Sequence, residues 1–262
     1  MEPSSEANAR APGLTAVMSA SSRKVHDYSN GLVQLRLVVL FTDRQLWGRA
    51  LGSFYHVYHA LEGAVEEALQ HPDLKPFAED LSATTGMFRT PGFEEDLCFF
   101  LGCHWPDKIL PGPAVSKYVD HLQLLGKTHP TLLLAHVYTQ HLAMLSGGQV
   151  IKRLARKRLE LPEDYGTKAF DVSEKLSLNT LRQRFKDKLD TLGKTMSAET
   201  WQQMLEEHQY AFKANNQIIS EFRVGWLPFT RGIVRLVPPI AQVSVLLCVA
   251  VAAAVALTRI SH

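Results

Sequence analysis

The sequence predicts an all-α fold, with a single helical domain over residues 14–222. Apolar residues recur at three- and four-residue steps through most of this range, the spacing that places them along one face of a helix. No run of alternating β-branched residues has the length and boundaries of a strand. Hydrophobic residues make up 46% and charged residues 21% of the 262-residue chain, a balance that supplies a core and excludes wholesale disorder.

The helical pattern begins with a short amphipathic segment, 14–26, which is expected to end at His26. Longer helices are predicted over 47–69, 115–125, 131–161, 176–192 and 198–222. Clusters of turn-forming residues separate them and predict chain reversals at 70–73, 90–92, 105–107 and 111–113. The polar, proline-containing residues 1–13 are expected to be disordered.

The C-terminal part has a different composition. Residues 236–258 contain no charged side chain, and 240–257 are apolar except for Gln242 and Ser244. A helix over 240–257 would be about 27 Å long, close to the hydrocarbon thickness of a bilayer. We therefore expect a transmembrane anchor over 240–258, joined to the helical domain by a connector over 223–239. A buried core helix is the alternative, but little chain is left to cover all of its faces.

The arginines around this segment predict its orientation. Arg223, Arg231 and Arg235 precede it, whereas Arg259 follows it. Because positive residues favour the cytoplasmic side of a membrane, the helical domain is expected to face the cytosol. Residues 1–13 do not resemble a signal peptide. We expect a tail-anchored protein of the endoplasmic reticulum membrane.

The charge balance and the cysteines exclude two classes of protein. Lys and Arg number 28 and Asp and Glu 26, a net charge of +2 that provides no general attraction to phosphates, so no nucleic acid partner is expected. Cys98, Cys103 and Cys248 are too few for a disulfide scaffold and match no zinc-binding spacing. Their small number is typical of a reducing compartment.

Two glycines interrupt the most apolar predicted helix. Gly147 and Gly148 lie within 131–161, and each costs roughly 1 kcal/mol relative to alanine in a helix interior. Two explanations are open: a kink that lets another helix pack closely, or a flat ligand that lies against backbone where no Cβ intrudes. His26 is a further candidate for a ligand-binding residue. A neutral imidazole on an amphipathic helix is a suitable axial ligand for heme iron.

Several short motifs occur in a fixed order along the chain. They are RKVH at 23–26, SFYHVY at 53–58, ALE at 60–62, LAHVYT at 134–139 and LSGGQV at 145–150. In order and spacing they closely resemble the heme oxygenases, and the resemblance covers roughly residues 14–222. The hydrophobic C-terminal segment is similar to that of the animal members.

The resemblance implies a heme held between a proximal helix and a kinked distal helix. His26 would be the axial ligand of the iron, and Gly147 and Gly148 would let the distal helix bend over the porphyrin. The residues expected to hold the heme carboxylates or to line the pocket are Arg23, Tyr138, Arg182, Lys186, Phe212 and Asn215. The implied reaction cleaves heme to biliverdin, carbon monoxide and ferrous iron, with O2 and electrons from NADPH. NADPH–cytochrome P-450 reductase and biliverdin reductase would be the protein partners.

The sequence departs from the family pattern on the distal side. Met144 stands where the family has an aspartate that organises proton-delivering waters, and a thioether can neither donate nor transfer a proton. Other departures are Ala143 for glycine, Gln140 for arginine and Ser19 for lysine. Three readings are open. In the first, the protein is a working heme oxygenase in which Gln140, Tyr58 or His141 orders the water. In the others it is a heme sensor, carrier or buffer, or a peroxidase-like heme protein.

A run of basic residues continues the distal helix. Its members are Lys152, Arg153, Arg156, Lys157 and Arg158. Three explanations of this run are open. It could be a docking surface for an acidic reductase, it could contact membrane headgroups, or it could be a solvated helix face with no partner.

Overall fold

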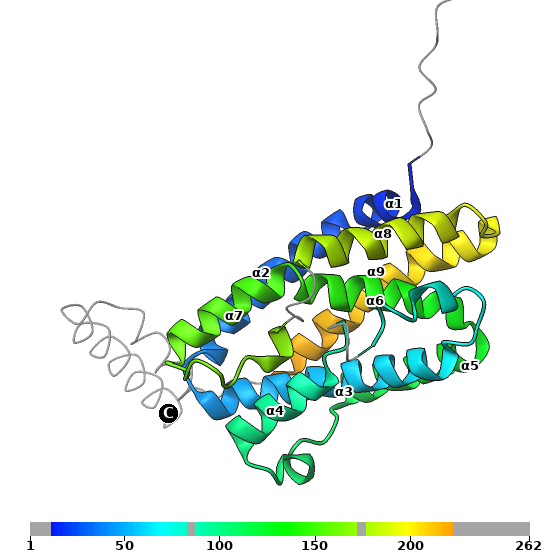
Figure 1. Cartoon of the computed structure of the whole chain (residues 1–262). Coiled ribbons are helices and arrows are strands. Elements are labelled where there is room, and N and C mark those ends of the chain that lie inside the picture. Colours follow the sequence, from blue (N-terminus) through cyan, green and yellow to red (C-terminus); the bar gives the residue numbers. More distant parts are fainter. Residues whose placement is uncertain (1–11, 83–86, 172–176, 223–262) are drawn as a thin grey trace, which may run out of the picture.

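The computed structural model describes residues 12–82, 87–171 and 177–222, and every regular element within these ranges is a helix (Figure 1). The α-helices are α1 (Leu14–Ser21), α2 (Arg23–Leu40), α3 (Arg44–Ala68), α4 (Thr90–Leu101), α5 (Pro113–Thr128), α6 (Leu133–Met144), α7 (Gly147–Arg158), α8 (Leu178–Gly193) and α9 (Ala198–Glu221). The 3-10 turns are η1 (Lys75–Phe77), η2 (Trp105–Lys108), η3 (Pro130–Leu132) and η4 (Lys168–Phe170). The predicted all-α class is confirmed for this part of the chain.

The predicted terminal segments fall mostly outside the described ranges. The connector expected over 223–239 and the anchor expected over 240–258 lie outside them, as does all but the end of the segment 1–13. Among the helices that the structure describes, none combines the length and the apolar character that a membrane span requires.

The helices pack around α6, which contacts α3 and α9 (Figure 1). Helix α3 packs against α4 and α5, while α9 runs along α6 and also touches α1, α2 and α5. Buried apolar side chains form two clusters. The larger one joins α3, α5, α6 and α9, and the smaller one joins α3, α4, η4 and Met144. Burial of each large side chain in these clusters stabilises the fold by roughly 1.5–3 kcal/mol.

The prediction of one helix over 14–26 is wrong, because the helix is interrupted at Ser22, between α1 and α2. The hydroxyl of Ser21 donates to the carbonyl of Met18 at 2.9 Å, and that of Ser22 to the carbonyl of Ser19 at 3.4 Å. Such local side-chain bonds compete with the helical pattern. As a result His26 lies in the first turns of an 18-residue helix instead of at the end of a short one.

The predicted turn at 90–92 is also wrong, because these residues form the first turn of α4. Pro91 is tolerated there, since the first amides of a helix have no intrahelical partner. The carboxylate of Glu62 on α3 accepts from the amides of Arg89, at 2.6 Å, and Thr90, at 3.0 Å. A buried acid from a neighbouring helix therefore caps α4.

Candidate functional site

A cavity of about 590 Å³ lies between α2 on one side and α6 and α7 on the other, with walls from α3, α8 and α9. Its volume is typical of a site for a small organic ligand. All twelve site residues expected from the sequence line it: Arg23, His26, Tyr58, Tyr138, Gln140, Met144, Gly147, Gly148, Arg182, Lys186, Phe212 and Asn215. The structure thus gathers residues from six helices in one place, while their individual roles stay predictions.

His26 lies on the α2 side of the cavity, and its side chain is 53% exposed. Its ring packs edge-on against Phe212, with 5.7 Å between the ring centroids. Asn30, one helical turn further on, places its Nδ2 atom 3.2 Å from Nδ1 of His26. Nε2 makes no hydrogen bond within the described residues, which leaves this nitrogen available as a ligand.

The opposite wall is formed where the predicted helix 131–161 is interrupted. Helix α6 ends at Met144 and α7 begins at Gly147, with Ser146 in a non-helical conformation between them. The expected kink is therefore a break. A Cβ at Gly147 would meet no atom within 4 Å, whereas one at Gly148 would lie 3.3 Å from both Sδ of Met144 and Cδ1 of Phe170. Glycine at position 148 therefore permits close packing against Met144 and Phe170, and glycine at position 147 leaves the helix backbone uncovered.

The charged residues on the cavity wall are all cationic. Among the described lining residues there is no Asp or Glu, and the cations are Arg23, Arg36, Arg182 and Lys186. Arg36 donates to the carbonyl of Phe222 at 3.1 Å. The Nε atom of Arg182 is buried and has no hydrogen-bond partner in the part of the chain that the structure describes. A cavity with this wall is suited to a ligand that carries carboxylates.

Tyr138 is held by α1. Its hydroxyl lies 2.9 Å from Oγ of Ser19 and donates to the carbonyl of Thr15 at 3.4 Å. Burial raises the pKa of Tyr138, so its hydroxyl stays neutral. Ser19 therefore helps to position the tyrosine.

An amide pair crosses the cavity wall between α6 and α9. Gln140 Nε2 donates to Oδ1 of Asn215 at 2.8 Å, and Asn215 Nδ2 donates to Oε1 of Gln140 at 3.2 Å. Gln140 Nε2 also donates to the hydroxyl of Tyr118 at 3.2 Å. The hydroxyl of Tyr58 donates to the backbone carbonyl of Gln140 at 2.8 Å. Gln140 is therefore held rigidly by its neighbours.

His141 and Met144, which follow on α6, have different surroundings. The side chain of His141 is buried behind the cavity wall, with Nε2 3.0 Å from Oε1 of Glu62, and it does not line the cavity. Hydrogen bonds from His141, Thr90 and the backbone amide of Arg89 outweigh burial and lower the pKa of Glu62. Met144 reaches the cavity from within the smaller apolar cluster.

The structure adds lining residues that the sequence reasoning missed, His208 and Asn30 among them. His208 lies 2.7 Å from Oγ1 of Thr139 and 3.0 Å from Oγ of Ser22, and burial lowers its pKa to about 4. The i, i+4 spacing from His26 could have identified Asn30. The same spacing relates His208 to Phe212, and their rings lie 5.2 Å apart, but the hydrogen-bond partners of His208 lie far away in the sequence.

Comparison with known proteins gives the same family as the motifs. The family model "Heme oxygenase" matches residues 13–221. Heme oxygenase 1 of Bos taurus is 36% identical over 176 residues, which are 66% of this chain and 58% of that protein. The heme oxygenase of Rhodella violacea is 31% identical over 186 residues, 71% of this chain and 76% of that protein. The chain thus spans less than two thirds of the bovine relative.

Solved structures agree with this match. Heme oxygenase 2 from Chlamydomonas reinhardtii, determined without heme, superposes with a TM-score of 0.79 at 46% identity, over 82% of this chain and 100% of that one. Heme oxygenase-2 from Synechocystis, in complex with heme and NO, gives 0.71 at 26% identity, over 80% of this chain and 85% of that one. By its sequence, its all-α fold and the matched residues, the chain belongs to the heme oxygenase family.

Proposed function

We propose that this protein binds heme in the cavity and cleaves it to biliverdin, carbon monoxide and ferrous iron. The observation that carries the proposal is the pairing of two cavity walls. On α2 lies a histidine whose Nε2 has no hydrogen-bond partner among the described residues, and the α6–α7 break forms the opposite wall. The described charged residues that line the cavity are all cationic. The family match supports the same reaction.

The residues present fit a heme. His26 would bind the iron through Nε2, and the amide of Asn30 beside Nδ1 would orient the ring. The unpartnered Nε of Arg182, together with Lys186 and Arg23, would hold the two carboxylates. The bare backbone at Gly147 leaves room for a flat ring. When bound, heme supplies an iron centre that takes up electrons and O2.

On the distal wall we propose that Met144 replaces the aspartate of the family. Its thioether cannot hold or transfer a proton, so this task would fall to Tyr58 and Gln140. The hydroxyl of Tyr58 uses its proton in the bond to the Gln140 carbonyl, and burial raises its pKa, which makes it a poor acid. The expected result is ring cleavage that is slower than in a relative with the aspartate.

A second function is favoured by the same substitution. Met144 belongs to an apolar cluster, and the amides of Gln140 and Asn215 are satisfied by each other. This distal wall suits a protein that binds heme without opening the ring, as a sensor, carrier or buffer. A peroxidase-like activity is the further outcome that a turnover experiment would reveal.

We also propose the membrane arrangement of animal members of the family. Residues 1–13 would be a disordered N-terminal segment, 14–222 the heme oxygenase-like domain, 223–239 a connector and 240–258 an anchor in the endoplasmic reticulum membrane. The uncharged stretch 236–258 supports the anchor. Resistance of the full chain to alkaline extraction from membranes, and its loss on deletion of 240–258, would test it.

NADPH–cytochrome P-450 reductase is the proposed electron donor, and biliverdin reductase the proposed acceptor of the product. On α7, Lys152 pairs with Asp171 at 2.5 Å, but Arg153, Lys157 and Arg158 are exposed. These three cations support a docking surface for an acidic reductase.

The test is turnover of the heme-loaded full chain with reductase and NADPH. Loss of the Soret band, with a biliverdin band and carbon monoxide, is expected. A stable Soret band over many turnovers of reductant would overturn the oxygenase function in favour of heme binding alone. Bleaching with oxidation of an added phenol, without biliverdin, would show the peroxidase-like reaction instead. His26→Ala should change the axial-ligand spectrum; an unchanged spectrum would disprove the assignment of His26.

A further inference from the structure

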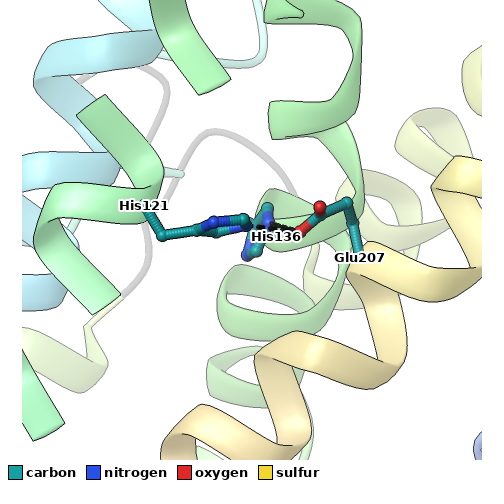
Figure 2. A group of neighbouring side chains, drawn as sticks. All are labelled: His121, His136 and Glu207. Carbon is teal, nitrogen blue, oxygen red and sulfur yellow. Dashed lines mark hydrogen bonds and ion pairs between the residues drawn. The ribbon is translucent and has the colours of Figure 1, made fainter. Parts of the chain in front are cut away.

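A second group of ligand-type side chains, none of which lines the cavity, lies where α5, α6 and α9 pack together. His121 comes from α5, His136 from α6 and Glu207 from α9 (Figure 2). One ligand atom from each of the three lies within 4.8 Å of the others. Oε2 of Glu207 is 2.7 Å from Nε2 of His121 and 2.9 Å from Nε2 of His136. Two imidazoles therefore converge on one carboxylate oxygen.

The packing of the helices holds these side chains in place. The ring of Tyr210 lies against His121, with centroids 4.2 Å apart, and His136 makes a tilted contact with Tyr118 at 5.6 Å. His136 is fully buried, while the side chains of Glu207 and His121 are 17% and 24% exposed. The cluster is thus rigid on the inner side and open to solvent at one edge, which gives an ion a path of entry.

The protonation states at neutral pH are those that metal ligands need. Hydrogen bonds from both histidines outweigh burial and lower the pKa of Glu207 to about 2, so its carboxylate is ionised. Burial lowers the pKa of His136, so its imidazole is neutral. Neither Glu207 nor His136 therefore has to lose a proton to solvent before a cation can bind. Binding through Nε2 of His136 requires only that its ring proton shifts to Nδ1.

We propose that His121, His136 and Glu207 form a binding site for a divalent transition-metal ion of the Zn²⁺ class, separate from the heme cavity. Two imidazoles and one carboxylate are an established ligand set for zinc, with a fourth position left for water. Tetrahedral bonds of about 2.0–2.1 Å place ligand atoms about 3.3 Å apart. The two histidine–glutamate distances would have to widen by about half an ångström. The two imidazole nitrogens, which lie within 4.8 Å of each other, would have to approach to the same spacing. Rotation of the Glu207 and His121 side chains at the open edge would supply both movements.

The hydrogen bonds around His136 suit this role. Nδ1 lies 2.9 Å from the hydroxyl of Tyr118. Without metal, Nε2–H donates to Glu207 and the tyrosine O–H donates to Nδ1. When Nε2 binds a cation, the ring proton has to be on Nδ1, and the tyrosine oxygen becomes its acceptor. Tyr118 also accepts from Gln140, so the state of this site reaches the distal wall of the cavity through two side chains.

The decisive experiment is a calorimetric titration of the heme-loaded full chain with Zn²⁺ in detergent micelles and metal-free buffer. Bound heme occupies His26, which prevents zinc from binding there. One zinc ion per chain is expected, with a zinc-edge X-ray absorption spectrum showing nitrogen and oxygen ligands near 2.0–2.1 Å and imidazole scattering. Zinc should also raise the unfolding midpoint.

His121→Gln and Glu207→Gln should each weaken zinc binding at least tenfold and abolish the rise in the midpoint. His71→Gln is the matched control, because His71 also has an acidic neighbour, Asp73 at 4.0 Å, but belongs to no three-ligand group in the part of the chain that the structure describes. It should bind zinc like the parent. Unfolding midpoints without metal show whether each variant is folded.

Equal zinc affinity in the parent and His121→Gln would overturn the proposal, as would a parent that binds no zinc. Neither result would bear on heme cleavage, which is measured separately. Tyr118→Phe should keep zinc binding but remove any effect of zinc on the Soret band. If that variant lost zinc binding while its unfolding midpoint without metal stayed that of the parent, the assignment of the site to these three residues would be wrong.

Discussion

Sδ of Met144 lies 3.3 Å from the position that a Cβ at Gly148 would occupy, so the two residues form one close contact at the α6–α7 break. Gly147, its neighbour, has open space at the same position. The two glycines look equivalent in the sequence, but they differ in the space that a side chain at each position would find.

Gly148→Ala is expected to lower the unfolding midpoint of the heme-free protein, because Met144 and Phe170 must move by a few tenths of an ångström. Gly147→Ala should leave that midpoint unchanged or raise it slightly, and should weaken heme binding because its methyl group enters the cavity. Thermal unfolding and heme titration of both variants measure these effects. The reverse order, with Gly147→Ala destabilising and Gly148→Ala silent, would contradict the roles assigned to them.

Met144→Asp should accelerate biliverdin formation, since it restores a group that can hold and transfer a proton. It should also destabilise the heme-free protein by about 1–3 kcal/mol, because the side chain is 9% exposed and belongs to an apolar cluster. Met144→Leu is the control, with a cost below about 1.5 kcal/mol and unchanged turnover. No gain in the single-turnover rate of Met144→Asp would show that the distal side is limited by something else.

Arg182→Gln and Lys186→Gln should each lower heme affinity about tenfold, which corresponds to about 1.4 kcal/mol. Each variant loses one charged partner for a carboxylate in a cavity whose described lining residues include no Asp or Glu. The control is Lys194→Gln, the same charge change at the exposed end of α8. Affinity is read from Soret titrations at two salt concentrations. Similar losses in the control would mean that only the overall charge matters.

Acid should destabilise the protein through Glu207. Its folded-state pKa, about 2, lies below the ordinary value of 4.5, so the stabilisation is complete above pH 4.5 and is lost as pH falls toward 2. Because burial lowers the pKa of His136, the unfolded state takes up a proton more readily than the folded state, and the protein loses further stability as pH falls below 6.5. The contribution of Glu207 at neutral pH is on the order of 2 kcal/mol. The measurement is the free energy of unfolding of the parent and of Glu207→Gln at a series of pH values. The variant should be less stable than the parent at pH 7, and its free energy of unfolding should change less between pH 4.5 and 2.

The repeating apolar pattern was sufficient to predict the long helices, because α3, α5, α8 and α9 each bury one continuous face. The apolar pattern was not sufficient where hydrogen bonds of individual side chains determine where a helix begins or ends. The α1–α2 break depends on serine hydroxyls, and the start of α4 depends on Glu62, a residue 27 positions earlier than Arg89. In the same way, motifs located His26 and Gly147, but the Gln140–Asn215 pair joins residues 75 positions apart and has no local signal.

The wholly cationic cavity wall has a consequence for the end of the proposed reaction. Ring opening would leave both carboxylates of the ligand intact, so Arg23, Arg182 and Lys186 would hold the linear tetrapyrrole as firmly as the intact porphyrin. What changes is the bond to His26, which disappears when the iron leaves. With that bond gone, the cations would be the contacts that retain the product, so weakening them would speed product release and weaken substrate binding together.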